Sequence, residues 1–189
     1  MEWDAVTWSL AEQVAELVAL SEKGQALLTA GLGPSEFFDK LRAAGALDDA
    51  AGFLAVALPR RLAISWARDC VAHTAREAKL KQPALLALSA VGAWLDDPSE
   101  ERRWTAHDAA NNAGMDGPEA LLAMAVFLSG GSISPPGTPQ PVPAPPELTG
   151  KLAGGAVLLA AVRVQPQLIA DTKLAFLDRG VKYAIGDAG

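Results

Sequence analysis

Cysteine and histidine are almost absent from this sequence. Its 189 residues include one cysteine, Cys70, and two histidines, His73 and His107. A single cysteine excludes an intrachain disulfide and is typical of proteins from a reducing compartment. A closed zinc site takes its ligands mainly from cysteine and histidine, and the chain offers too few of them. We therefore expect no metal site, and no sequence motif indicates a bound cofactor.

Long apolar runs are missing as well. The longest of them, such as residues 152–162, fall far short of the roughly 20 residues that a membrane-spanning helix needs. The first residues, MEWDAVTWSLAEQ, are acidic and lack the basic start and apolar core of a secretory signal. We therefore predict a cytoplasmic protein that does not insert into a membrane.

The chain also lacks an excess of positive charge, because its formal net charge is −6. An acidic protein repels phosphate backbones unless its basic residues gather locally. Asp69 and Glu77 interrupt the nearest such group, so we predict that nucleic acid is not a partner. The group consists of Arg60, Arg61, Arg68, Arg76, Lys79 and Lys81.

Alanine and leucine are abundant, and hydrophobic residues make up 50% of the chain. This composition favours helices, since alanine loses no side-chain entropy in a helix and leucine loses little. We predict an all-α fold, a compact array of about eight helices arranged as helical hairpins. The array is expected to form one domain, residues 1–189, whose main part is residues 1–134.

Apolar residues at helical spacing, together with start and stop signals, place the individual helices. Residues 97–100 read DPSE, which predicts an acidic N-cap, proline at N1 and glutamate at N3. Gly180 is expected to end the last helix. The Gly154-Gly155 pair inside an apolar helix predicts the close approach of another helix. The predicted helices span residues 5–20, 35–44, 48–58, 60–78, 84–95, 99–112, 118–129, 148–164 and 167–177.

Proline is concentrated in one segment, residues 135–146, which read PPGTPQPVPAPP. Proline at this density excludes helix and central strand and favours extended polyproline II. We predict an extended strap that lies across the helical surface and leads to a C-terminal helical pair, residues 147–180, packed back on the main array. The alternative is that its P-x-x-P spacings bind an aromatic groove on another protein.

Asp69, Cys70 and His73 form the only local grouping of a nucleophile with a base. A reactive thiol needs a lowered pKa, whereas burial within a helix raises it. We therefore interpret Cys70 as a buried structural residue and keep an enzyme that uses Cys70 and His73 as an alternative. Paired carboxylates at residues 48–49, 96–97 and 100–101 stand at helix starts, where the helix dipole favours negative charge. No catalytic residue is predicted.

Five stretches carry a pattern that extends over roughly residues 45–180. Its most specific parts are ALPRRLAISWA at residues 57–67 and FLSGGSISPP at residues 127–136. With these stretches the chain resembles an uncharacterised family of small bacterial helical proteins to which no activity is assigned. Members of that family are often encoded near type VI secretion genes, so the resemblance implies an accessory or adaptor role. Residues 66–113 are also similar to alanine-rich immunity proteins of bacterial toxin systems. The five stretches are LDDAAGFLAVALPRRLAISWA, AWLDDPSEERRWTAHDAA, AVFLSGGSISPP, PVPAPPELTGKLAGGAVLLAAV and AFLDRG.

Tryptophan and arginine guide the search for a binding surface, since both are common at the centres of protein interfaces. Trp66 and Trp94 lie on apolar stripes and are expected in the core. Arg60, Arg61 and Trp104 are predicted to belong to an interaction surface, together with the proline strap.

These observations predict a non-enzymatic helical protein that binds another protein. The first hypothesis is an accessory protein of a bacterial type VI or other contractile secretion system. The alternative is an immunity protein that neutralises a toxin by binding it, its acidic surface complementing a basic partner. The enzyme based on Cys70 and His73 is a third possibility.

Overall fold

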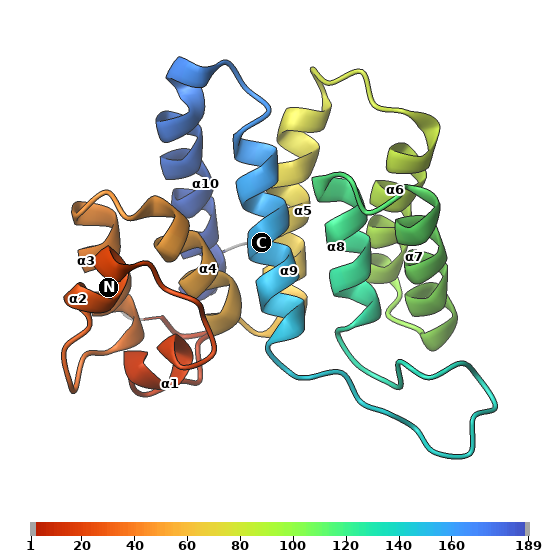
Figure 1. The fold of residues 1–189 in the computed structure, drawn as a ribbon, viewed down its shortest axis with the longest axis horizontal. Helices are drawn as coiled ribbons and strands as arrows, with labels where there is room; N and C mark the ends of the chain where they lie inside the picture. Colours follow the sequence, from red (N-terminus) through yellow and green to blue (C-terminus); the bar gives the residue numbers. More distant parts are fainter. Residues whose placement is uncertain (1–2, 188–189) are drawn as a thin grey trace.

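The computed structural model describes residues 3–187, and every regular element in this range is a helix (Figure 1). Eight of the ten α-helices are seven residues or longer, which confirms the predicted all-α array of about eight helices. No helix within the described range is both long and apolar enough to cross a membrane. The elements are α1 (Ala11–Ala15), α2 (Glu22–Leu27), α3 (Pro34–Ala43), α4 (Leu47–Ala57), α5 (Arg60–Ala75), α6 (Gln82–Asp96), α7 (Glu100–Asn112), α8 (Pro118–Phe127), α9 (Leu148–Ala161), the 3-10 helix η1 (Pro166–Leu168) and α10 (Ile169–Ala184).

Helix α9 is the centre of the array, where it packs against α4, α5, α8 and α10 (Figure 1). Helices α6, α7 and α8 pack on one another and form one edge of the molecule. Helices α1 to α3 cover α4 at the opposite edge. The core therefore runs through α4, α5 and α9, and the α6–α7 pair lies outside it.

Small residues let α9 approach α4 closely. A Cβ atom at Gly150 would lie 2.7 Å from the carbonyl oxygen of Ala55, and one at Gly154 would lie 3.0 Å from the Ala55 Cβ. The close approach predicted from the Gly154-Gly155 pair is confirmed at Gly154, whereas Gly155 faces the Leu121 side chain at 3.2 Å. Gly150, one turn earlier, makes the closest approach to the α4 backbone.

Gly180 does not end the last helix, contrary to the prediction, because α10 continues to Ala184. A Cβ at Gly180 would lie 2.5 Å from Leu54 Cδ2 and 2.8 Å from Trp66 Cε2. The Trp66 ring is completely buried, and its Nε1 donates a hydrogen bond to the Phe176 carbonyl at 2.8 Å. The glycine therefore makes room for a core tryptophan, and its missing side chain serves packing rather than helix termination.

Two helix starts also differ from the prediction. The helix expected over residues 5–20 is reduced to the short α1, and a separate helix, α2, begins beyond it, where the N-cap Ser21 accepts a hydrogen bond from Gly24 N at 3.1 Å. The Asp49 carboxylate accepts a hydrogen bond from Ser21 N at 2.9 Å and so holds this second start in place. Helix α7 has Ser99, not Asp97, as its N-cap. The start of α2 thus depends on Asp49, a residue distant in sequence from Ser21.

The strap, residues 135–146, precedes the last two helices as predicted but does not lie across the helical surface. Residues 135–143 are all exposed, and the segment doubles back on itself (Figure 1). Ser132 and Pro143 form an antiparallel bridge, and Ile133 N donates a hydrogen bond to Val142 O at 2.8 Å. The strap therefore pairs with the residues that precede it, Ser132 and Ile133, and not with the helices.

Candidate interaction sites

Arg60 and Arg61, two residues of the predicted interaction surface, stand exposed at the start of α5. Arg60 Nη1 donates a hydrogen bond to Ser129 O at 2.9 Å, just after α8, and Arg61 Nη2 donates to Leu95 O at 2.8 Å, near the end of α6. Helix ends leave such carbonyls without partners inside the helix. Both arginines therefore stabilise helix ends within the chain.

Trp104, the third predicted residue, lies half-buried on α7 in a small aromatic cluster. Its ring packs edge-on against Phe127, with the ring centroids 4.9 Å apart, and against His107 at 5.2 Å. Its Nε1 donates a hydrogen bond to Glu100 Oε1 at 3.0 Å. The structure thus brings Arg60 and Trp104 to the same end of α8, while Arg61 contacts a different helix end.

Arg103 is the residue at this place that the sequence did not single out. It is 3% exposed, and its Nη1 donates a hydrogen bond to Phe127 O at 2.5 Å while its Nη2 donates to Ser132 O at 2.6 Å. Its Nε donates to Glu100 Oε2 at 2.7 Å and its Nη2 to Glu100 Oε1 at 2.5 Å. These two hydrogen bonds from Arg103 lower the pKa of Glu100. One buried guanidinium therefore joins α7 to the end of α8 and to the strap root, by which we mean residues 127–134.

A glycine is required beside this guanidinium. Gly131 has φ +62°, and a Cβ at that position would lie 2.8 Å from Glu100 Oε2 and 2.9 Å from Arg103 Nη2. The FLSGGS stretch noted in the sequence therefore has a physical reason, since a side chain at Gly131 would displace the ion pair. A Glu100–Arg103 pair at i, i+3 on one helix face was the available signal.

Cys70 lies where a nucleophile could not act. It is completely buried, and this burial raises the pKa of its thiol. The neighbouring Asp69 accepts a hydrogen bond from Tyr183 Oη at 2.6 Å, and His73 Nδ1 lies 3.4 Å from Arg179 Nη2. The geometry thus matches the buried structural cysteine predicted from the sequence and gives no support to the alternative of a Cys70 and His73 enzyme.

The thiol of Cys70 is expected to be unreactive in the folded protein. Because the thiolate is the reacting species and is both buried and disfavoured, 5,5′-dithiobis(2-nitrobenzoate) should label it at least about a hundredfold more slowly than in guanidinium chloride. A Cys70→Ala, Leu159→Cys variant gives the matched control, since Leu159 is 40% exposed. Equal labelling rates of Cys70 in the native protein and of this control would contradict the buried assignment.

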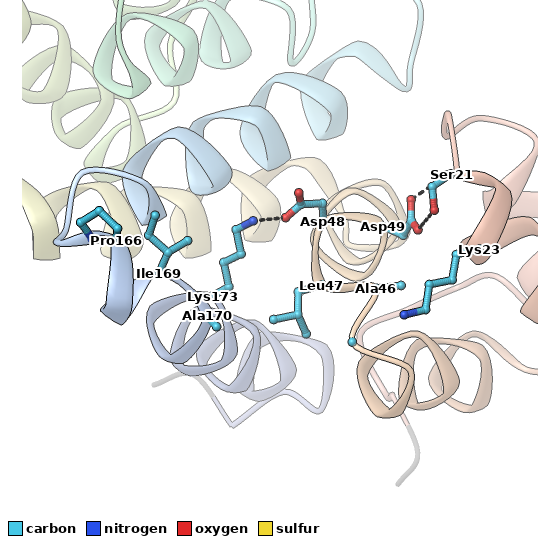
Figure 2. Close-up of a pocket in the computed structure, with 11 residues that line it drawn as sticks. Ser21, Lys23, Ala46, Leu47, Asp48, Asp49, Pro166, Ile169, Ala170 and Lys173 are labelled. Carbon is cyan, nitrogen blue, oxygen red and sulfur yellow. Dashed lines mark hydrogen bonds and ion pairs between the residues drawn. The ribbon is translucent and has the colours of Figure 1, made fainter.

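A pocket of about 590 Å³ lies between α2, α4 and α10 (Figure 2). Both of its carboxylates are engaged: Lys173 donates to Asp48, and Asp49 accepts a hydrogen bond from Ser21 Oγ at 2.5 Å. The paired carboxylates at the start of α4 thus do more than favour the helix dipole, because they tie α10 and α2 to α4. Lys23, which is exposed, has no ion-pair partner within the described part of the chain. The pocket is a seam between helices whose polar contacts hold the fold.

A second hollow, a groove of about 630 Å³, is lined by α6 and α7. These two helices lie at one edge of the molecule (Figure 1). Leu86 is 53% exposed in the wall of the groove. Its lining is predominantly apolar and repeats at helical spacing on both helices, namely Gln82, Pro83, Leu86, Ser89, Ala90 and Ala93 from α6 with Thr105, Asp108, Ala109 and Asn112 from α7. We call this the α6–α7 groove. The sequence did not reveal it, because α6 is apolar on most of its faces and shows no distinct stripe.

Asp108 gives the groove a negative rim. Its side chain is 73% exposed, and one carboxylate oxygen lies 2.9 Å from His107 Nδ1. Asp108 is the one acidic residue among those that line the groove. The groove therefore combines an apolar floor with a single exposed carboxylate on its α7 wall.

The fold and these surfaces define an all-helical protein with an apolar interhelical groove and an exposed proline-rich loop. The chain belongs to the family of unknown function DUF6931, whose family model matches residues 37–184. This membership confirms the predicted resemblance to an uncharacterised family and includes both of its most specific stretches, residues 57–67 and 127–136. Neither a curated protein nor a solved structure matches the chain.

Proposed function

We propose that this protein is a non-enzymatic interaction protein that binds an amphipathic helix of a protein partner in the α6–α7 groove. The observation that carries the proposal is Leu86, a large apolar side chain that stands 53% exposed in an apolar groove. In helix-in-groove recognition the bound helix places its apolar anchors, at i, i+3, i+4 and i+7, into an apolar groove of this kind.

The partner's chemistry follows from the lining. Ala90, Ala93 and Ala109 are small and leave room for leucine-sized anchors between the two helices. Asp108 favours a lysine or arginine on the flank of the bound helix, and the net charge of −6 favours a basic partner as a whole. The occupant we propose is therefore a basic amphipathic helix.

Two biological settings fit such a partner. An accessory role in a type VI or other contractile secretion system follows from the family resemblance and stays a prediction, as does the cytoplasmic location. The immunity alternative is supported by the acidic groove wall, which suits a basic toxin. Co-expression distinguishes them, since an immunity protein relieves the lethality of the toxin encoded beside it and an accessory protein does not.

Site-specific photo-crosslinking tests the groove directly. A photoreactive benzoyl-phenylalanine at position 86 should give one discrete adduct in the source cell, because the partner helix covers that side chain. The same residue at position 159, an exposed leucine on α9, is the matched control and should not give that adduct. Absence of an adduct at position 86, or the same adduct at both positions, would count against the proposal.

Substitutions then measure the contribution of the groove. Leu86→Glu should weaken binding of the captured partner helix at least tenfold, or about 1.4 kcal/mol, because a carboxylate would be buried against apolar anchors. Asp108→Lys should slow association through charge repulsion. Leu159→Glu should leave the affinity unchanged in isothermal titration calorimetry, and an equal loss in this variant would show that the groove is not the binding site.

A further inference from the structure

The connection between α8 and α9 is far longer than the geometry requires. The two helices pack on each other, and Figure 1 shows that α8 ends and α9 begins at the same end of the array. Helix pairs of this kind are joined by about 2–8 residues, whereas residues 128–147 make the connection here. Loops longer than about 12–15 residues without secondary structure are usually functional or are linkers. A linker between separate units is not what α8 and α9 need, because they already pack together.

The tip of this connection contributes little to the fold. Residues 135–143 are all exposed, and within the described part of the chain the hydrogen bonds that they form connect them only to one another and to Ser132 and Ile133. Thr138 Oγ1 donates to Pro135 O at 2.7 Å, and Val142 N donates to Ser132 Oγ at 3.0 Å. The exposed tip thus closes on itself and leaves its apolar side chains in solvent.

The root of the connection is held firmly, in contrast to the tip. The buried Arg103 binds the carbonyl oxygens of Phe127 and Ser132, one on each side of Gly131. Binding segments are commonly loops presented by a rigid scaffold. A proline-rich segment also loses little conformational freedom when it binds, because each proline ring fixes φ beforehand.

The composition of the tip defines what could recognise it. Residues 135–146 contain no charged side chain and include P-x-x-P spacings at residues 136–139 and 143–146. Gly137, with φ +86°, turns the chain within the first of these spacings, and residues 139–146 form the proline-rich stretch that follows, bridged to Ser132 at Pro143. Grooves lined by tryptophan and tyrosine bind such stretches by packing on the proline rings and donating hydrogen bonds to the carbonyls.

We propose that residues 139–146 are a polyproline ligand, presented on an Arg103-anchored loop to an aromatic-lined groove on a protein partner. This second interaction surface does not rest on the α6–α7 groove. The predicted strap across the helices gives way to the alternative weighed beside it, because the exposed tip has no helical surface to support.

Titration of the full chain against purified polyproline-binding domains tests the proposal. The probes are a panel of SH3, WW and EVH1 domains, followed by isothermal calorimetry and by NMR of the domain. We expect at least one domain to bind, with shifts at its groove tryptophan and tyrosine residues. A variant with Pro139, Pro141, Pro145 and Pro146 changed to alanine should bind at least tenfold more weakly and keep the melting temperature of the parent.

The outcomes are decisive in either direction. Leu86→Glu should bind the domain as the parent does, so a failure of the α6–α7 groove proposal leaves this test intact. Binding by no domain above the level of the alanine variant would overturn the proposal. A large loss of melting temperature in the alanine variant would overturn it too, since the strap would then be a structural element of the fold.

Discussion

Gly150→Ala is expected to destabilise the protein by about 1–3 kcal/mol, the range for overpacking a dense core. The added Cβ would lie 2.7 Å from Ala55 O and 2.8 Å from Val56 Cα, both of them backbone atoms. A side chain could rotate away from such a contact, whereas here α9 or α4 has to move. Helix propensity alone would favour alanine by up to about 1 kcal/mol, so the steric cost must exceed that gain. Urea unfolding followed by circular dichroism measures the difference.

Gly92→Ala is the matched control for this substitution. Gly92 also lies inside a helix, α6, but its nearest neighbours are Arg68 guanidinium nitrogens at 3.7 Å, an ordinary contact. Alanine should therefore stabilise the protein there by about 0.5–1 kcal/mol through propensity. Opposite signs at the two positions would establish that the close packing of α9 on α4, and not the low helix propensity of glycine, decides the effect at Gly150. The same sign at both positions would refute it.

The helices could be predicted from the sequence because their signals are local. Pro59 and Pro118 mark the starts of α5 and α8 correctly, whereas the DPSE stretch predicts an α7 N-cap two residues too early. Gly180 was misread because a glycine that ends a helix and one that admits a tryptophan look the same in sequence. The partner that distinguishes them, Trp66, lies more than a hundred residues away.

The candidate sites were less predictable than the fold, for a related reason. Arg60, Arg61 and Trp104 were chosen by residue type, and each of them makes contacts inside the chain that no local pattern reveals. Leu86 was missed because exposure of one face of an apolar helix depends on which neighbours cover the others. The strap was located correctly from its prolines, yet its path depends on Arg103, which holds the root from another helix.

Arg163→Met is expected to cost about 3 kcal/mol of unfolding free energy, because it leaves a buried carboxylate without its cation. Glu119 on α8 is 1% exposed, and its Oε2 accepts a hydrogen bond from Arg163 Nη2 at 2.7 Å while Oε1 accepts one from Nη1. Breaking such a pair typically costs about 3–5 kcal/mol. The lower end applies because Glu119 lies in the first turn of α8, where the helix dipole partly offsets its charge.

The double variant Glu119→Met, Arg163→Met separates charge from packing. Removing both charged groups should recover most of the lost stability, because apolar residues of similar volume replace a buried pair at little or no cost. Arg42→Met provides the exposed comparison, since Asp178, its partner at 2.5 Å, is 61% exposed and the pair should contribute at most about 1 kcal/mol. If Arg163→Met lost no more stability than Arg42→Met in urea unfolding, burial of Glu119 would not be what the pair compensates. A double variant as unstable as Arg163→Met alone would instead assign the cost to the packing of the guanidinium between α8 and the end of α9.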